Sequence, residues 1–240
     1  MLVLVKTGLQ LVYYMKRLAT EVNIKHHVVH TTKFSQSVRC LFISDVHQRT
    51  IPKSFTKWSY DFVLIGGDLV EGGVPLSRVE KNIQRLSTVG PCYYVFGNND
   101  REVGEHELLQ LFSKYDVKVL SNRTERLETI PMQIVGIDDG YTGTVDIDKA
   151  FEDVDPSIFT LFMTHSPHYF SKVEGIDLEV AGHHHGGQIR FLNYGIQPVG
   201  TFTKRNNRHS LISNGFGTTA LPLRLGAESE VHSIQIVGKK

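Results

Sequence analysis

Short apolar runs that end in polar residues recur along the chain from residue 39 onward. Four to six apolar residues followed directly by Asp, His, Asn or Gly are typical of buried strands that deliver polar groups at their C-terminal ends. In open α/β sheets, ligands bind at that edge of the sheet. The runs are RCLFISDVH (39–47), YDFVLIGGD (60–68), CYYVFGNND (92–100), FTLFMTHSPH (159–168) and LEVAGHHH (178–185).

The segments between these runs carry the periodicity of helices. Apolar residues recur at three- and four-residue spacing over 75–90 and 105–117, which predicts amphipathic helices packed on a sheet. After residue 188 the pattern changes to short strands with turn residues at 189–195, 210–217 and 230–237, which predicts an antiparallel second sheet. We therefore expect an α/β fold, with one domain over residues 38–240.

The first fifteen residues are mostly apolar and are interrupted by Lys6 and Gln10. As a helix they would span about 22 Å, which is short of the roughly 30 Å hydrocarbon core of a membrane. We expect either a helix docked on the domain or a helix that lies in the membrane interface, anchored by Lys16 and Arg17. Residues 21–37 are expected to form a connecting strand and loop. Residues 1–37 are thus interpreted as an N-terminal helical or amphipathic extension and connector.

The composition narrows the classes of protein that this chain can be. Its 240 residues include 26 basic and 25 acidic ones, so the formal net charge of +1 gives no signal for nucleic-acid binding. The hydrophobic fraction of 40% excludes a disordered chain. The two cysteines, Cys40 and Cys92, lie inside apolar runs, which favours unpaired thiols in a reducing cytoplasm. Association with the membrane surface through residues 1–20 is a second possibility.

Each polar motif at a strand end has an ordinary structural explanation when it is taken alone. Asp45 and His47 could be surface residues after a strand, and the motifs GGD and GNND are typical of turns. A single His165 would more often be a hydrogen-bonded core residue than a metal ligand. The segment 182–188, GHHHGGQ, is the most specific signal, because three consecutive imidazoles would be costly to bury without a partner.

The five motifs together, in this order, resemble the calcineurin-like metallophosphoesterases, whose pattern runs D-x-H, G-D, G-N-H-D/E, H and G-H-x-H. Within that superfamily, GHHHGGQ and the block GFGTTALPLR at 215–224 resemble a branch of small bacterial phosphohydrolases. The resemblance covers roughly residues 39–237. It implies a four-layer α-β-β-α sandwich with two mixed sheets and a dinuclear metal site at the C-terminal ends of the strands.

The resemblance also implies a set of metal ligands. One divalent ion is expected to be held by Asp45, His47, Asp68 and His185, and the second by Asp68, Asn98, His165 and His183. A shared anionic carboxylate offsets the repulsion between two dications. The donor set holds no thiolate, which favours manganese, iron or zinc and argues against a structural zinc site.

Two such ions would lower the pKa of a shared water, so that a metal-bridging hydroxide could attack a phosphoester. The chain departs from the family pattern at Asn99, where a His is common, and a carboxamide cannot act as a titrating acid. His184, His168 or water would have to protonate the leaving group, unless that group is already good. We therefore expect phosphodiesters, pyrophosphates or activated esters as substrates. Arg49 and Arg101 are candidates for phosphate contacts, although solvated surface arginines are as common.

Two other functions are compatible with parts of this pattern. A catalytically silent scaffold would explain Asn99, but all seven expected ligand positions are filled, which favours an enzyme. A metal-storage protein would explain the three consecutive histidines but not the separate Asp and Asn motifs. The expected partner is a small-molecule or lipid-linked phosphoester, with peripheral membrane contact through residues 1–20 as an alternative to helix docking.

Overall fold

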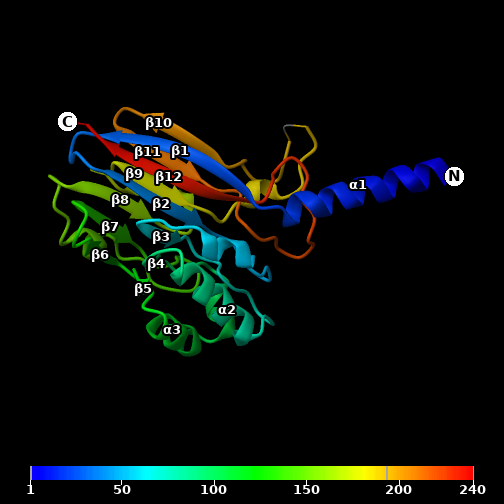
Figure 1. Ribbon diagram of the computed structural model, residues 1–240, viewed down its shortest axis with the longest axis horizontal. Coiled ribbons are helices and arrows are strands. Elements are labelled where there is room, and N and C mark those ends of the chain that lie inside the picture. The colour runs from blue at the N-terminus through cyan, green and yellow to red at the C-terminus, as the bar shows by residue number, and fades with distance from the viewer. Residues whose placement is uncertain (1, 193, 240) are drawn as a thin grey trace.

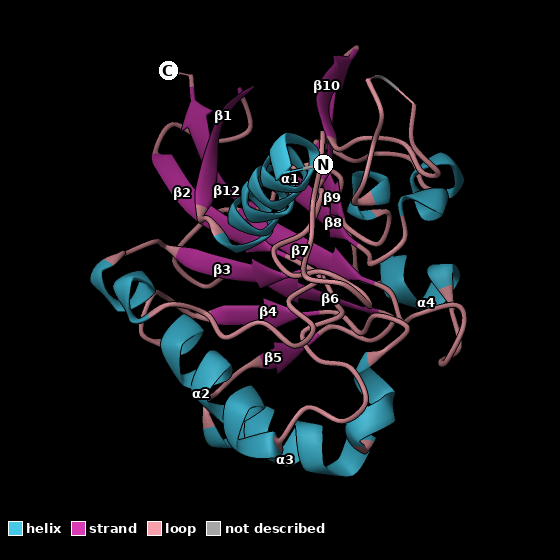
Figure 2. Ribbon diagram, turned by 90° about the vertical axis from the view of Figure 1, so that its right-hand side faces the viewer, coloured by secondary structure: helices cyan, strands magenta, loops and turns pink. Residues whose placement is uncertain are grey.

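A computed structural model describes residues 2–192 and 194–239. Two six-stranded mixed sheets lie face to face, and helices cover both outer faces (Figures 1 and 2). The α-helices are α1 (Leu2–Thr20), α2 (Leu76–Ser87), α3 (Glu105–Lys114) and α4 (Ile147–Phe151). Short 3₁₀ helices span Lys53–Lys57, Asp100–Val103, Pro167–Lys172 and His185–Gly187.

The first sheet contains the strands that precede residue 120 and the last strand of the chain. Its central strands are parallel, as expected for strands joined by helical crossovers, whereas β12 runs antiparallel to β2 and parallel to β1. In spatial order the strands are β1 (Asn23–Thr31), β12 (Glu230–Gly238), β2 (Ser37–Ile43), β3 (Phe62–Ile65), β4 (Cys92–Tyr94) and β5 (Lys118–Val119).

The second sheet contains the strands between residues 123 and 212. Its four inner strands are parallel, and an antiparallel strand closes each edge. In spatial order the strands are β10 (Thr201–Arg205), β11 (Arg208–Ile212), β9 (Leu178–Ala181), β8 (Phe159–Met163), β7 (Met132–Gly136) and β6 (Arg123–Arg126).

The alternation of side chains along β2 explains the layers. Cys40 and Phe42 point into the core between the sheets, where they meet residues such as Leu161 of the second sheet. Leu41 and Ile43 point to the opposite face and pack in a second core. That second core is closed by apolar residues of α2 and α3, namely Val79, Ile83, Leu86, Leu108 and Phe112. A third core beneath α4 covers the outer face of the second sheet, which completes four layers.

The α/β class, the two mixed sheets and the helices near 75–90 and 105–117 are confirmed. The expectation of an antiparallel second sheet after residue 188 is wrong. In this part of the described chain, β10 and β11 form an antiparallel hairpin, but β11 continues the parallel part of the second sheet through β9. Strand β12 joins the first sheet instead, and the segment from residue 189 contributes an isolated bridge between Phe191 and Tyr194. Strand length alone could not reveal these partners, because the pairings are long-range.

The N-terminal region forms one long helix followed by an edge strand. The last turns of α1 pack on the body through Met15, Leu18 and Ala19, while the turns before them stand away from it (Figure 1). None of the helices that the structure describes is both long and apolar enough to cross a membrane. Strand β1, from the expected connector, pairs along its whole length with β12. The boundary at residue 38 between an extension and a domain stays a prediction.

Candidate metal centre

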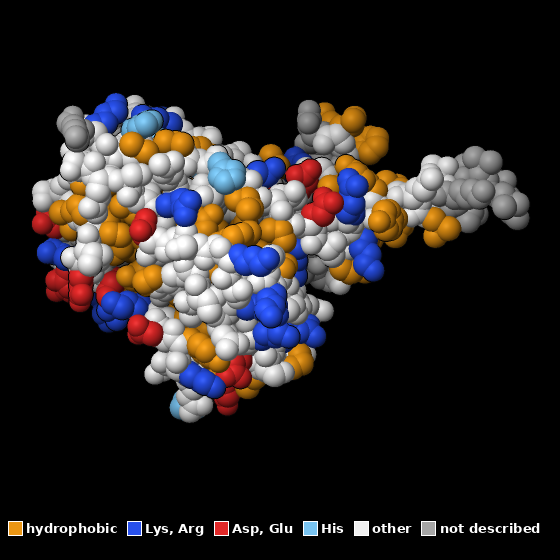
Figure 3. Space-filling view, viewed as in Figure 1, with side chains coloured by type: hydrophobic (Ala, Val, Ile, Leu, Met, Phe, Trp, Pro, Cys, Tyr) orange, Lys and Arg blue, Asp and Glu red, His pale blue; other side chains and the backbone are white. Residues whose placement is uncertain are grey.

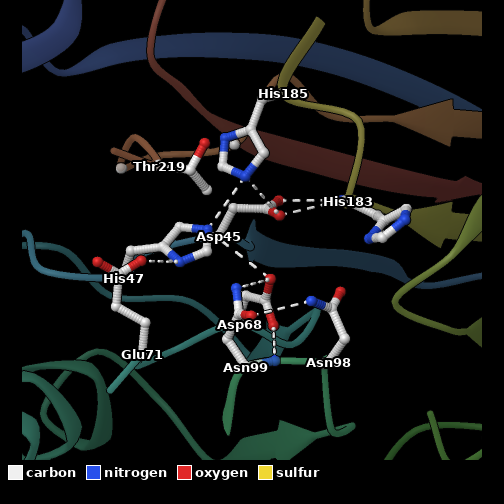
Figure 4. Close-up of polar contacts among 12 residues, drawn as sticks. Asp45, His47, Asp68, Glu71, Asn98, Asn99, His183, His185 and Thr219 are labelled. Atoms are coloured by element: carbon white, nitrogen blue, oxygen red, sulfur yellow. Dashed lines mark hydrogen bonds and ion pairs between the residues drawn. The ribbon is translucent and has the colours of Figure 1, made fainter. Parts of the chain in front are cut away.

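The expected ligands lie in loops at the C-terminal ends of β2, β3, β4, β8 and β9. Figure 4 shows how those other than His165 lie together. Five of them have a positive φ between 48° and 74°, a backbone conformation that residues with a Cβ adopt at a cost of about 1–3 kcal/mol. The five are Asp45, His47, Asp68, His183 and His185. Strain of this kind persists where the surrounding structure enforces it, and such clusters are typical of functional sites.

Backbone hydrogen bonds join the loops after β2 and β3. The amide of Asp45 donates to Gly67 O at 2.9 Å, and the amide of His47 donates to Asp68 O at 3.1 Å. Gly67 has a φ of 83°, and a Cβ at that residue would lie 2.7 Å from the amide nitrogen of Gly97. Glycine is therefore required at position 67 for the loops after β3 and β4 to approach.

Asp100 holds the loop after β4 against the loop after β3. Its carboxylate is fully buried and accepts hydrogen bonds from the amides of Asp68 and Gly97 at 2.8 and 2.7 Å and from Val70 at 3.1 Å. Burial and the nearby Asp68 carboxylate raise the pKa of Asp100 to about 7. The last residue of the GNND motif thus fixes the two loops that carry Asp68 and Asn98.

One group of possible ligands brings together Asp45, His47 and His185. Their donor atoms lie within 4.8 Å of one another and all three side chains are buried. The Nε2 atoms of His47 and His185 are 3.0 Å apart, and His185 Nε2 is 3.4 Å from Asp45 Oδ1. Burial lowers the pKa of His185 to about 4, so its imidazole is neutral at pH 7 and carries a lone pair that can bind a metal.

A second group brings together Asp45, Asp68 and His165, again within 4.8 Å. His165 Nε2 lies 3.3 Å from Asp68 Oδ2 and 3.2 Å from both Asn98 Oδ1 and His183 Nδ1. Although burial alone would lower it, the Asp68 carboxylate raises the pKa of His165 to about 10. The carboxylates therefore create a negative potential that favours a positive charge at this position.

The donor set fits two divalent cations. The same oxygen of Asp68, Oδ2, faces both groups, because it lies 3.7 Å from His47 Nε2 and 3.3 Å from His165 Nε2. Carboxylates, imidazoles and a carboxamide suit manganese, iron or zinc. All seven residues expected as ligands from the sequence are thus brought to one place, although their roles as ligands stay a prediction.

Two residues outside the expected set support the histidines. Glu71 Oε2 lies 2.9 Å from His47 Nδ1, and Gly66 O lies 2.9 Å from His165 Nδ1. Partners of this kind fix the orientation of an imidazole and leave its Nε2 free for a metal. No sequence signal pointed to Glu71, because the residue belongs to no motif and reaches His47 only through the fold.

The role of Arg224 was also not apparent from the sequence, although this residue is the last one of the GFGTTALPLR block at 215–224. Its side chain is fully buried and donates to at least four backbone carbonyl groups. Nη2 lies 2.6 Å from both Asn214 O and Gly217 O, whereas Nη1 lies 3.0 Å from Ala227 O and 3.3 Å from His185 O. Arg224 therefore ties the segment that carries His185 to two other loops.

The two arginines expected to contact phosphate are engaged elsewhere. Arg49 donates to Glu21 O at 3.1 Å, to Phe216 O at 2.5 Å and also to the carbonyl of Thr20. Arg101 pairs with Glu105, at 2.6 Å, and with the carboxylate of Asp138, at 2.9 and 3.0 Å. The structure does not bring either guanidinium to the ligand cluster, because nearby carbonyl and carboxylate groups hold both side chains.

Asn99 contacts the cluster directly. Its amide nitrogen donates to Asp68 Oδ1 at 2.9 Å, and its side-chain Nδ2 donates to Asp68 Oδ2 at 3.1 Å. His184 stands between two expected ligands, and together with Asn99 it lines the cavity beside the cluster. His168, the other expected proton donor, is exposed beside Tyr169.

The cavity beside the cluster has a volume of about 520 Å³. Its lining combines the polar groups of Asp68, Asn98 and the three consecutive histidines with the apolar side chains of Ile189, Ile196 and Leu221. Gln188, the last residue of GHHHGGQ, joins two lining segments, because its side chain accepts from the amide of Thr219 at 2.8 Å and donates to the carbonyl of Thr219 at 3.1 Å. The cavity can therefore accept a ligand that carries both a polar and an apolar group.

Comparisons with known proteins agree with this arrangement. The chain is 39% identical over 212 residues to the uncharacterized protein YpbG of Bacillus subtilis, a match that covers 82% of this chain and 80% of YpbG. It is 27% identical over 240 residues to the phosphodiesterase YaeI of Escherichia coli, covering 89% and 87% of the two chains.

Among solved structures, the chain resembles the 5'-nucleotidase precursor of Thermus thermophilus, with a TM-score of 0.53 and 13% identity. That match covers 85% of this chain and 55% of the nucleotidase, so it supports the fold alone. The family model for calcineurin-like phosphoesterases matches residues 38–187, the range that contains all of the expected ligands. The chain therefore belongs to the calcineurin-like phosphoesterase family.

Proposed function

We propose that this protein is a dinuclear metal-dependent phosphohydrolase that cleaves a phosphodiester, a pyrophosphate or an activated phosphoester. The observation that carries this proposal is the convergence of five strand-end loops on one cluster, in which Asp68 Oδ2 faces one histidine of each ligand group. One ion would be held by Asp45, His47, Asp68 and His185, and the other by Asp68, Asn98, His165 and His183. When bound, such ions lower the pKa of a water and polarise phosphoryl oxygens.

The remaining residues of the site would position the substrate and the bridging carboxylate. Asn99 donates to both oxygens of Asp68, through its backbone and its side chain, and so fixes the orientation of that carboxylate. Neither group of Asn99 can supply a proton to a leaving alkoxide at neutral pH. We propose that His184, which lines the cavity, contacts the leaving group. A substrate with a good leaving group needs no such proton, so activated esters and diesters would be hydrolysed faster than alkyl monoesters.

The experiment combines a substrate series with a change to the shared carboxylate. With manganese, we expect hydrolysis of bis(p-nitrophenyl) phosphate and little hydrolysis of alkyl phosphomonoesters. Asp68→Asn should lower kcat by about two orders of magnitude or more, because it removes the anion that faces both ligand groups. Asp148→Asn, an exposed carboxylate on α4, is the matched control and should keep full activity.

Metal content gives a second readout that does not depend on turnover. We expect two ions per wild-type chain and fewer in Asp68→Asn, with an unchanged circular dichroism spectrum. If Asp68→Asn keeps most of its activity at saturating manganese, the two-metal assignment is wrong. If the wild type binds two ions but cleaves no substrate in the series, a silent scaffold is the better interpretation. More than two ions per chain would favour metal storage.

A further inference from the structure

A set of large apolar side chains stands in solvent on the segment that follows the GHHHGGQ motif. Phe191, Leu192, Tyr194 and Ile196 are 77%, 78%, 80% and 88% exposed, although such residues are usually at least half buried in soluble proteins. Ile189 and Leu221 are also exposed and lie beside them at the mouth of the cavity. We refer to these six residues as the apolar rim.

Hydrogen bonds hold the rim in this exposed position. The backbone groups of Phe191 and Tyr194 bond reciprocally at 2.9 and 3.0 Å, which makes a tight turn. Arg190 turns inward and donates to Gly186 O at 2.9 Å and to Gln197 O at 2.6 Å. These polar groups therefore form hydrogen bonds within the protein, and the apolar side chains of the segment point toward solvent.

Helix α1 adds a second exposed apolar surface at the same end of the molecule. Five residues in its middle, Leu9, Leu11, Val12, Tyr13 and Tyr14, are 43–71% exposed. Its C-terminal turns adjoin the loop that carries Leu221, because Ala19 and Thr20 line a small pocket together with Ala220 and Pro222. Figure 3 shows hydrophobic side chains along α1 and over the loop above it. The two surfaces lie on the same side of the chain and are connected through residues 219–222.

The distribution of charge favours a particular occupant for this surface. Acidic residues make up 25 of 240, so a stretch as long as 180–227 would carry about five on average, yet it carries none. Residues 1–20 also lack acidic groups and contain three basic ones. The acids that flank these stretches are neutralised, because Glu21 pairs with Arg17 at 3.2 Å and Glu228 pairs with Lys25 at 3.4 Å. Apolar side chains in a region that holds no acidic residues, beside the exposed Lys16 and Arg17 of α1, are complementary to an anionic lipid surface.

The rim is continuous with the cavity at the candidate metal centre. Ile189, Ile196 and Leu221 belong to the rim and also line the cavity, together with His183 and Asn98. A molecule with a phosphoester at one end and a hydrocarbon chain at the other would match this mixed polar and apolar lining. The phosphoester of such a molecule would reach the expected metal ligands, and its hydrocarbon chain would extend along the apolar rim.

We propose that the rim and the exposed side of α1 dock on the surface of an anionic lipid bilayer, and that the substrate is a lipid-anchored phosphoester drawn from that bilayer. The second part rests on the proposed phosphohydrolase activity, whereas the first does not. The apolar residues enter the interfacial region, and the lipid headgroup enters the cavity without leaving the membrane. Contact of this depth is consistent with the finding that no described helix can cross a membrane.

The docking surface is tested by sedimentation with vesicles. We expect the full-length protein to bind vesicles of phosphatidylcholine and phosphatidylglycerol, and to bind vesicles of phosphatidylcholine alone more weakly. The double variant Phe191→Ser, Leu192→Ser should bind the anionic vesicles about tenfold more weakly. Leu109→Ser, an exposed leucine on α3, is the matched control and should bind as the wild type does. Equal binding by all three proteins, or a dimer in solution that the double variant abolishes, would overturn the proposal.

The substrate class is tested with two p-nitrophenyl diesters. One is soluble bis(p-nitrophenyl) phosphate, and the other is a phosphatidyl p-nitrophenyl ester embedded in anionic vesicles. We expect the wild type to prefer the embedded ester, and the double variant to lose that preference while it keeps its activity on the soluble diester. Hydrolysis of the soluble diester alone would overturn the lipid substrate but not the phosphohydrolase. If the protein binds vesicles but hydrolyses neither diester, the proposed phosphohydrolase activity is overturned, whereas the proposed docking surface is not.

Discussion

Replacement of Arg224 by lysine keeps the positive charge of this buried side chain but removes the planar arrangement of its hydrogen-bond donors. The guanidinium serves at least four carbonyl oxygens from two nitrogens, whereas an ammonium group has three donors on one atom and a shorter reach. At least two carbonyl groups would lose their partner. Each unsatisfied buried group costs about 1–3 kcal/mol, so the loss of two partners should lower the free energy of unfolding by about 2–6 kcal/mol.

The same substitution should weaken metal binding, because one of these carbonyl groups belongs to His185. Loss of a residue that positions a metal ligand commonly costs about 10- to 100-fold in metal affinity. The control is Arg208→Lys on β11, since Arg208 also donates to a backbone carbonyl, Val173 O at 2.8 Å, and to Glu179. We expect Arg208→Lys to lower stability without changing metal affinity.

Two measurements check these expectations. Urea unfolding of the metal-free proteins, followed by circular dichroism, gives the change in stability. Competition with a chelator gives the affinity for manganese, independently of turnover. A loss of less than about 1 kcal/mol in Arg224→Lys would show that its carbonyl partners are satisfied in another way. An equal loss of metal affinity in Arg208→Lys and Arg224→Lys would show that Arg224 has no specific role in positioning His185.

Two further predictions concern Glu71, which lies beside the candidate metal centre, and Cys92, which lies away from it. Glu71→Gln should weaken metal binding about 10- to 100-fold, measured by chelator competition, because the substitution disturbs the contact with His47 Nδ1. The control is Glu102→Gln, since Glu102 is an exposed carboxylate 2.6 Å from the amide of Gly72. This control should change metal affinity less than about threefold. Burial raises the pKa of the Cys92 thiol to about 12, so only about one molecule in 10⁴ carries the reactive thiolate at pH 8. An aromatic disulfide reagent should therefore leave Cys92 unmodified until urea unfolds the protein, and rapid reaction of the folded protein would contradict this burial.

The sequence predicted where the candidate site lies better than it predicted which side chains point into that site. Polar residues after Ile43, Ile65 and Ala181 converge because their strands end at the same edge of the molecule, which apolar runs reveal directly. Arg49 and Arg101 also follow such strands, yet carbonyl and carboxylate partners far along the chain turn them away from the cluster. A local pattern carries no information about those partners.

The same limit explains the residues that the sequence did not reveal. Glu71 and Arg224 act through contacts with His47 and with the backbone of His185, and neither contact follows from spacing. The partners of β12 were likewise hidden, because an alternating strand can pair within either sheet, and β12 in fact lies between β1 and β2. The alternation of apolar and polar residues identifies a strand, but the strands that it pairs with depend on the packing of the whole chain.

Arg49 links the end of the N-terminal helix to a loop of the candidate metal centre. Its guanidinium bonds to the carbonyl groups of Thr20 and Glu21, where α1 ends, and its backbone lies two residues beyond His47. The same guanidinium also bonds to Phe216 O, next to the segment that Arg224 secures. We therefore expect that a displacement of α1 that keeps these bonds also shifts the loop that carries His47. A ligand that moves α1 would then alter the geometry of the candidate metal centre.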